Sequence, residues 1–152
     1  MKLFKIIFIV STVSLLQRYT YVSKEINIFK KVEIKEKVLA TYTGNITAYG
    51  PDCKGCSGIT ASGYNVRNDN IYYNDKEYGK IRIVAMDKKI PFGTIIRIKE
   101  ISKEPIVAIV LDRGSAIGFS KKVYIDLLYE SEKETLTFGK KKATFEILRY
   151  GF

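Results

Sequence analysis

The sequence after residue 37 is built from short runs of β-branched and aromatic residues, separated by clusters of Gly, Pro, Asn, Asp or Lys. The runs are VLATYTGNITAYG, KIRIVAMD, GTIIRIKEI, PIVAIVLD, VYIDLLY and ATFEILRYGF. Such runs favour strands, and such clusters favour turns. Several runs alternate in polarity, whereas IVAIVL is apolar throughout and is expected to be buried on both faces. The sequence therefore predicts a mainly β fold, a small closed or nearly closed β-barrel.

One short helix interrupts this pattern. Ser131 begins a Ser-x-x-Glu capping box with Glu134, and Gly139 is expected to end the helix.

The chain has 152 residues and 46% hydrophobic content, enough for one compact domain plus a tail and too little for two ordinary domains.

The first residues have the features of an export signal. Lys2 and Lys5 flank and interrupt an apolar run, which Gln17 and Arg18 end before the roughly 20 residues that span a bilayer. No Ala-x-Ala cleavage site follows, so an uncleaved membrane anchor stays open, and a core strand or helix is a further alternative. We expect a signal or anchor in residues 1–22, a Lys/Glu-rich linker in residues 23–37, and the barrel domain in residues 38–152. The protein is thus expected to be exported to the outside of the cell, or held at the membrane if the segment stays uncleaved.

The chain is strongly basic, with a formal charge of +10 and a pI near 9.5. Its non-specific partners are therefore expected to be anionic: nucleic acid, an acidic membrane surface or a wall polymer. The sequence has no recognised DNA-binding helix or zinc motif, and the export signal also argues against nucleic acid. Basic clusters at residues 30–31, 121–122 and 140–142 suit an anionic wall polymer, although a solvated Lys-rich surface explains them equally well.

Three aspartates stand where apolar runs stop: Asp87 after IVAM, Asp112 after IVL and Asp126 after VYI. A buried carboxylate without a partner is costly, and its pKa rises. Aspartate is also a common turn residue, which is explanation enough for any one of the three. Together they predict a group of carboxylates at one rim of the barrel.

Six segments in order carry a resemblance to a known family: ITAYG, TASG, VAMDKKIPFGTIIRI, VLDRGSAIG, VYIDLLYES and TFGKKKATFEIL. They resemble the three-aspartate (3D) domain of bacterial cell-wall proteins, which is similar to the catalytic core of membrane-bound lytic transglycosylase A and more distantly to rare lipoprotein A. The likeness covers residues 46–148. It implies a six-stranded double-psi β-barrel with one or two short helices, acting on peptidoglycan glycan strands without a cofactor.

The implied reaction breaks the β-1,4 bond between MurNAc and GlcNAc and closes the C6 hydroxyl onto C1, leaving a 1,6-anhydro end. One carboxylic acid can perform both proton transfers. The resemblance assigns this acid to Asp126. It places Asp112 beside Asp126, where Asp112 would raise the pKa of Asp126 by like-charge repulsion or orient it through hydrogen bonds. Asp87 is given a role in substrate or site support.

We expect substrate contacts at Tyr49, Thr60, Ser62, Gly63, Gly114, Ser115 and Lys122. Of these, Thr60, Ser62 and Gly63 match a segment of the resembling family and could hydrogen-bond sugar hydroxyls, although Thr-x-Ser-Gly is also an ordinary turn. Tyr49, Tyr64, Phe92 and Phe119 could stack on sugar rings, although most aromatic residues of such a chain serve as core or surface filling.

Two departures from the family pattern concern the neighbourhood of Asp112. The segment between Asp112 and Asp126 is a few residues longer than usual, with the extra length near residues 119–122, and it would border the site. Arg113 stands where the family more often has Thr. An Arg113–Asp112 ion pair would lower the pKa of that acid, which favours a supporting role for it.

The two cysteines, Cys53 and Cys56, lie in a glycine-containing loop segment, PDCKGCSG. Zinc is disfavoured because the chain has no His and no second Cys pair. A small disulfide suits an exported protein, and reduced cysteines remain the alternative.

A non-catalytic module that binds wall polysaccharide is the competing function, because a barrel fold does not fix an activity. The enzyme needs an acid of raised pKa beside a groove, whereas the binder does not need Asp126.

Overall fold

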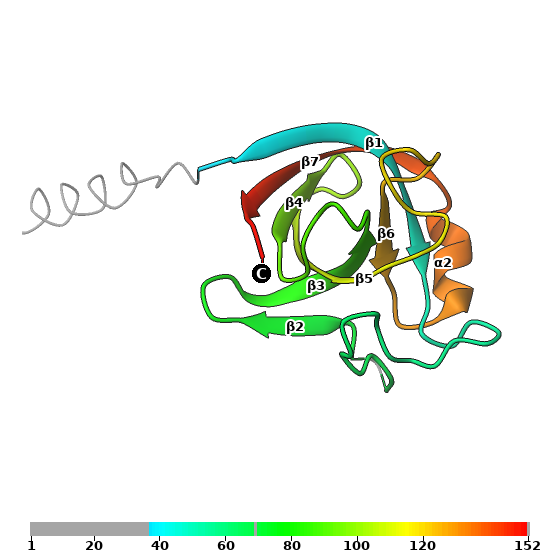
Figure 1. Cartoon of the computed structure of the whole chain (residues 1–152). Helices are drawn as coiled ribbons and strands as arrows, with labels where there is room; N and C mark the ends of the chain where they lie inside the picture. Colours follow the sequence, from blue (N-terminus) through cyan, green and yellow to red (C-terminus); the bar gives the residue numbers. More distant parts are fainter. Residues whose placement is uncertain (1–36, 69, 152) are drawn as a thin grey trace, which may run out of the picture. The chain divides into compact units, whose positions relative to one another are not determined.

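The computed structural model describes residues 37–68 and 70–151 (Figure 1). The expected signal or anchor, residues 1–22, and all but the last residue of the expected linker, 23–37, lie outside the described residues. Within the described residues no helix is long and apolar enough to cross a membrane.

Six strands of the described chain form a closed ring. They are β1 (Ala40–Tyr49), β3 (Gly79–Met86), β4 (Ile95–Lys99), β5 (Ile106–Asp112), β6 (Ile125–Leu128) and β7 (Lys141–Arg149). Their order is β3-β5-β4-β7-β1-β6, and β6 pairs back onto β3, so the ring closes. A further strand, β2 (Tyr72–Asp75), pairs with β3 alone. The predicted fold, mainly β with a closed six-stranded barrel, is confirmed.

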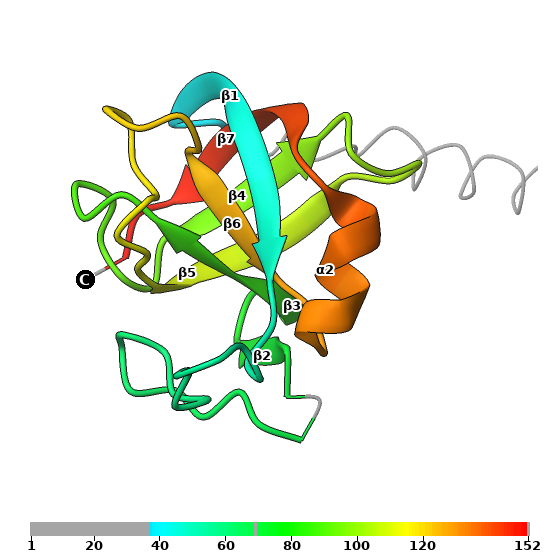
Figure 2. The same cartoon turned by 90° about the vertical axis from the view of Figure 1, so that its right-hand side faces the viewer.

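Two of the ring's pairings are parallel, β1 with β6 and β3 with β5, and the others are antiparallel. Figure 2 shows β1, β6 and β3 side by side, with the connection between β1 and β2 beyond the end of β1. Residues 50–71 join β1 to β2 and residues 113–124 join β5 to β6. The strands of each of these two pairs are not neighbours in the sheet, so the connections are long.

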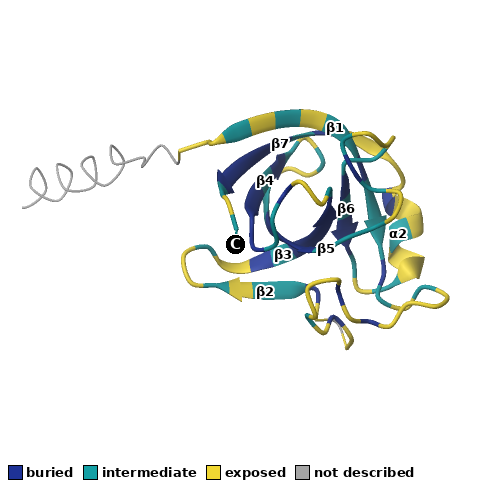
Figure 3. Ribbon diagram, in the orientation of Figure 1, coloured by how far each residue is buried: buried dark blue, intermediate teal, exposed yellow. Residues whose placement is uncertain are grey.

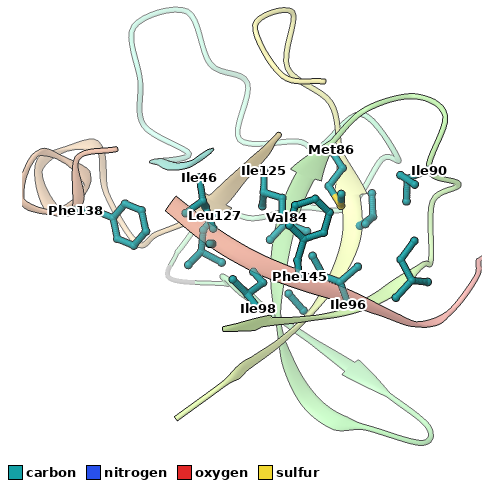
Figure 4. Packing of buried hydrophobic residues seen from close by; sticks show 14 residues of the cluster. Ile46, Val84, Met86, Ile90, Ile96, Ile98, Ile125, Leu127, Phe138 and Phe145 are labelled. Carbon is teal, nitrogen blue, oxygen red and sulfur yellow. The ribbon is translucent and has the colours of Figure 1, made fainter. Parts of the chain in front are cut away.

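Both faces of the central strands are buried (Figure 3). On β5, Ala108 and Val110 belong to the core cluster drawn in Figure 4, whereas Ile109 and Leu111 belong to a second cluster. The second cluster also contains Val66, from the connection between β1 and β2. This confirms the expectation that the IVAIVL run is buried on both faces, and it shows that the long connection covers one of them.

The single helix of the described chain, α2 (Glu132–Phe138), begins and ends where the sequence predicts. The Ser131 hydroxyl accepts a hydrogen bond from the Glu134 N–H at 3.4 Å, and Gly139 ends the helix with a φ of 64°. Phe138 is buried and packs against Tyr129, with ring centroids 5.6 Å apart. The resemblance implied one or two short helices, and the described residues contain one.

Phe145 is the largest of the fully buried side chains, at 1% exposure. Truncating Phe145 to alanine is expected to lower the free energy of unfolding by about 3–5 kcal/mol, because apolar contacts are lost and a cavity remains. Leu136→Ala is the matched control, since Leu136 is 79% exposed. Urea unfolding of the two variants measures both effects, and equal losses would show that the barrel interior is not the main core.

Candidate functional site

Strand register brings Asp112 and Asp126 together. Asp112 on β5 and Asp126 on β6 are both paired with Ala85 on β3, one from each side. Asp126 is paired in turn with Thr47 on β1. Directly paired residues of neighbouring strands share a face of the sheet, so the two acids flank one small residue. The structure therefore places together two of the three aspartates that the sequence singled out.

A β-bulge places Asp112 in this row. The parallel pairing of β3 with β5 runs from Val84–Val110 to Ala85–Asp112, so Leu111 is the extra residue. Bulges commonly re-aim a side chain beside a functional site. Without the extra residue, Asp112 would be paired with Met86, which belongs to the core. The bulge thus turns the end of a core strand into part of a site.

The two carboxylates line a cavity of about 270 Å³. Ala85 contributes to its lining, and a larger residue there would take up space between the acids. The remaining lining comes from the end of β1, the connection after it and the start of the loop after β5, namely Tyr49, Gly50, Pro51, Cys56, Ser57, Gly58, Ile59, Val66, Arg113 and Gly114. The cavity is small, and its lining combines charged groups with apolar side chains.

Three donors fix the Asp112 carboxylate. Its Oδ1 accepts the backbone N–H of Ala61 and of Arg113, each at 2.8 Å. Its Oδ2 accepts the Tyr49 hydroxyl at 2.7 Å. Burial, followed by the charge of Asp112, raises the pKa of Tyr49 well above its ordinary value, so this hydroxyl stays a donor. Donors to both oxygens hold a carboxylate in one orientation.

Asp126 has a different environment. It is half-buried, and its carboxylate accepts one hydrogen bond in the described structure, from the Thr47 hydroxyl to Oδ1 at 2.7 Å. Burial raises the pKa of Asp126 above its ordinary value, the negative charge of Asp112 adds to the rise, and the Thr47 hydrogen bond opposes it. Two acids with unlike environments are the usual basis for dividing acid and base roles. Asp126 is the group of this pair that is suited to hold and donate a proton.

Arg113 does not use its guanidinium to bind the Asp112 carboxylate in the described structure. The guanidinium donates instead to the carbonyl oxygens of Ile90 at 2.7 Å, Asp112 at 3.0 Å and Met86 at 3.5 Å. It also lies 4.0 Å from the centre of the Phe92 ring. The ion pair considered from the sequence is therefore replaced by contacts to the backbone, because the carbonyls of the neighbouring turn lie within reach.

Asp87 lies apart from the other two acids and does not line their cavity. Its Oδ1 accepts the Lys89 N–H and its Oδ2 accepts the Phe119 N–H, both at 2.8 Å. These hydrogen bonds, with the one from Lys89 the largest cause, lower the pKa of Asp87. Asp87 thus stays ionised and anchors the loop after β5, a geometry that fits the site support expected of it and not proton donation.

The TASG segment contributes to the site through its backbone. Thr60 is buried, and its hydroxyl lies 3.0 Å from the Ser62 hydroxyl and accepts the Tyr64 N–H. Ser62 and Gly63 line a separate hollow, together with Tyr64 and other residues. The N–H of the intervening Ala61 is what reaches Asp112.

The other expected substrate contacts, Gly114, Ser115 and Lys122, do not all line the cavity of the two acids. Gly114 lines the cavity of Asp112 and Asp126 as well as a second cavity, and Ser115 lines the second only. Lys122 is exposed, and its carbonyl accepts the Asn45 side-chain N–H at 2.8 Å.

Among the aromatic candidates, Phe119 packs inward, with ring centroids 5.0 Å from Tyr42 and 5.3 Å from Tyr124. Tyr64 and Phe92 border the same hollow. Phe119 therefore serves the core, whereas the other two stand at a surface.

Cys53 and Cys56 form a disulfide bond in the structure. Cys56 lines the cavity of the two acids, so the disulfide closes the loop that forms one wall of the site. Among the described residues no cluster of His, Cys, Asp or Glu is arranged to hold a metal ion.

Sequence reasoning missed three residues of the site: Thr47, Ala61 and Ala85. Ala85 gave a signal, because it is the one small residue in the run IRIVAM. Thr47 and Ala61 gave none, since one acts through register across two strands and the other through a backbone N–H.

Comparison with known proteins gives two relatives, both from Bacillus subtilis (strain 168). The chain is 37% identical over 97 residues to the "SPbeta prophage-derived uncharacterized protein YorM", a match covering 62% of this chain and 37% of that protein. It is 31% identical over 107 residues to the "Putative cell wall shaping protein YabE", covering 70% of this chain and 22% of that protein. No protein-family profile matches the chain. The chain thus corresponds to a minor part of each relative's length.

Replacing Asp126 by Asn is expected to stabilise the protein at neutral pH. A folded-state pKa above the unfolded one favours folding at low pH, and this contribution is lost as pH rises through the folded-state pKa. The Asn variant does not lose this contribution. Its free energy of unfolding is therefore expected to equal that of the unmodified protein well below pH ~4 and to exceed it increasingly as pH rises above that value. Urea unfolding between acidic and neutral pH measures the difference, with Glu104→Gln, an exposed change of equal charge, as control. A less stable Asn variant at neutral pH would contradict the assignment.

Removing the Thr47 hydroxyl by Thr47→Val is expected to raise the pKa of Asp126 further, because the hydrogen bond favours the ionised carboxylate. Carbon-detected NMR titration of the Asp126 carboxyl measures the midpoint directly. An unchanged or lower midpoint would mean that Thr47 does not act on this acid.

Proposed function

We propose that this chain is a peptidoglycan lytic transglycosylase of the three-aspartate (3D) type, which cleaves the β-1,4 bond between MurNAc and GlcNAc. The observation that carries the proposal is the half-buried Asp126, with a raised pKa, beside the firmly held Asp112 in one cavity. The six family-like segments and the name of the wall-shaping relative support the same substrate.

In this mechanism Asp126 enters protonated and gives its proton to the glycosidic oxygen as the bond from C1 to that oxygen breaks. The resulting carboxylate then takes the proton of the C6 hydroxyl as O6 bonds to C1. The acid is restored, water is not consumed, and one new end is a 1,6-anhydro sugar. A single group that acts first as acid and then as base needs a pKa near the working pH, which is the direction in which burial moves Asp126.

Asp112 has a positioning role in the proposal. Its negative charge helps to keep the proton on Asp126, and its own oxygens are held by Tyr49, Ala61 and Arg113. The site needs no cofactor for this chemistry, because every proton is moved by one side chain and the nucleophile belongs to the substrate.

The proposed setting is the cell wall, reached by export through the N-terminal segment. The formal charge of +10 supports attraction to anionic wall polymers over a range set by ionic strength.

Digestion of purified peptidoglycan with the full chain tests the activity, with mass analysis of the released fragments. The unmodified protein is expected to release products with 1,6-anhydro ends, and Asp126→Asn is expected to lose about 10²–10⁴-fold in rate. Glu104→Gln, which removes one exposed carboxylate of the turn between β4 and β5, is expected to keep full activity.

Two outcomes would overturn the proposal. Reducing ends in place of anhydro ends would show hydrolysis. Binding of both the unmodified protein and Asp126→Asn to wall material, with no release of fragments, would show a binding module.

A further inference from the structure

A second cavity, of about 550 Å³, adjoins the cavity of Asp112 and Asp126. The two share Arg113 and Gly114 in their linings, so a ligand that extends past these residues would occupy both. The second cavity lies between the turn that follows β3 and the loop that follows β5, which run close together in Figure 2.

Positive charge predominates in the lining of this cavity. It contains Lys88, Lys121 and Arg113, with Asp87 as its acidic member. Ser115 and Ser120 add hydroxyl donors. A hollow with ammonium groups and hydroxyls is suited to a carboxylate or a phosphate.

The acidic member of the lining is already occupied. Both oxygens of Asp87 accept backbone N–H groups, from Lys89 and Phe119. Gly118 packs so closely that a Cβ added there would lie 2.5 Å from the Asp87 Oδ2. The hydrogen bond from Phe119 fixes the loop to Asp87, and this holds Ser120 and Lys121 at the cavity.

The cationic members are of two kinds. Arg113 is immobilised by carbonyl oxygens and by the Phe92 ring, so it supplies a fixed positive charge at the boundary of the two cavities. Lys88 and Lys121 are exposed, and within the described part of the chain neither forms an ion pair with an acidic side chain. In this part of the chain neither ammonium group is bound directly by a carboxylate, and the charge of Lys88 also helps to lower the pKa of Asp87.

We propose that the second cavity binds an anionic substituent, a carboxylate or a phosphate, of the polymer whose neighbouring sugar lies at Asp126. This inference rests on the proposed function for placing a sugar of the polymer at Asp126. The positive charge of the cavity lining is the reason to expect an anionic group beside that sugar. In a bacterial wall the carboxylate would come from a peptide stem and the phosphate from an attached anionic polymer.

Binding of small probes to the full-length Asp126→Asn protein tests the site without turnover. The probes are the dipeptide L-alanyl-D-glutamate, glycerol 3-phosphate and the uncharged sugar N-acetylglucosamine. We expect the anionic probes to shift the backbone amide NMR signals of residues 114–121, more weakly at higher salt, and the uncharged sugar to leave them unchanged. The anion with the lower Kd identifies the source of the substituent.

A matched pair of double variants separates a specific site from general basic charge. Lys88→Gln with Lys121→Gln is expected to raise the Kd of the anionic probe by about five- to tenfold, since charge-assisted hydrogen bonds are lost. Lys103→Gln with Lys133→Gln removes the same charge from exposed positions outside the cavity and is expected to change the Kd less than twofold. Equal effects of the two pairs, or shifts confined to other residues, would overturn the site.

The failure of this proposal can be told apart from failure of the proposed function. Anion binding at residues 114–121 without release of anhydro fragments would leave the site standing and remove the activity. Release of anhydro fragments without anion binding there would do the reverse.

Discussion

The pairing of β6 with β3 is the contact on which both the barrel and its site depend. Three residue pairs make it, and they include Met86–Ile125 and Val84–Leu127, which belong to the core, and between them Ala85–Asp126. The pairing that closes the ring therefore also sets an acid beside a small residue. A slip of one residue would exchange the faces of the strand and place Asp126 in the core, so the apolar neighbours on either side fix its position.

Closure also explains why the two acids differ, although each ends or begins a buried strand. Asp112 leaves β5 at a bulge, where a turn supplies free backbone N–H groups and Tyr49 approaches from β1. Asp126 lies within β6, where backbone N–H groups are committed to the strands on both sides, and a single hydroxyl reaches it. The contrast in donors follows from position in the ring: three donors hold the Asp112 carboxylate in one orientation, whereas Asp126 accepts one hydrogen bond and burial raises its pKa.

The sequence predicted the parts of the structure that depend on local chemistry. Runs of β-branched residues predicted the strands, and Ser131 with Gly139 predicted the helix. The sequence predicted all three aspartates in one group, whereas in the structure Asp112 and Asp126 share a cavity and Asp87 lines the neighbouring one. The bulge at Leu111 and the N–H of Ala61 could not be predicted, since register and backbone donors leave no mark in residue type.

The loop between Asp112 and Asp126 leads from the site to its neighbouring cavity. In the structure this loop is held at its middle by Asp87, and Gly118 is the residue that allows the approach, because any side chain there would collide with the carboxylate. A loop held at one point by an internal acid can present its remaining residues in a constant position. The third aspartate then acts on the site of the other two only through this loop, because it fixes the residues that line the cavity between Arg113 and Lys121.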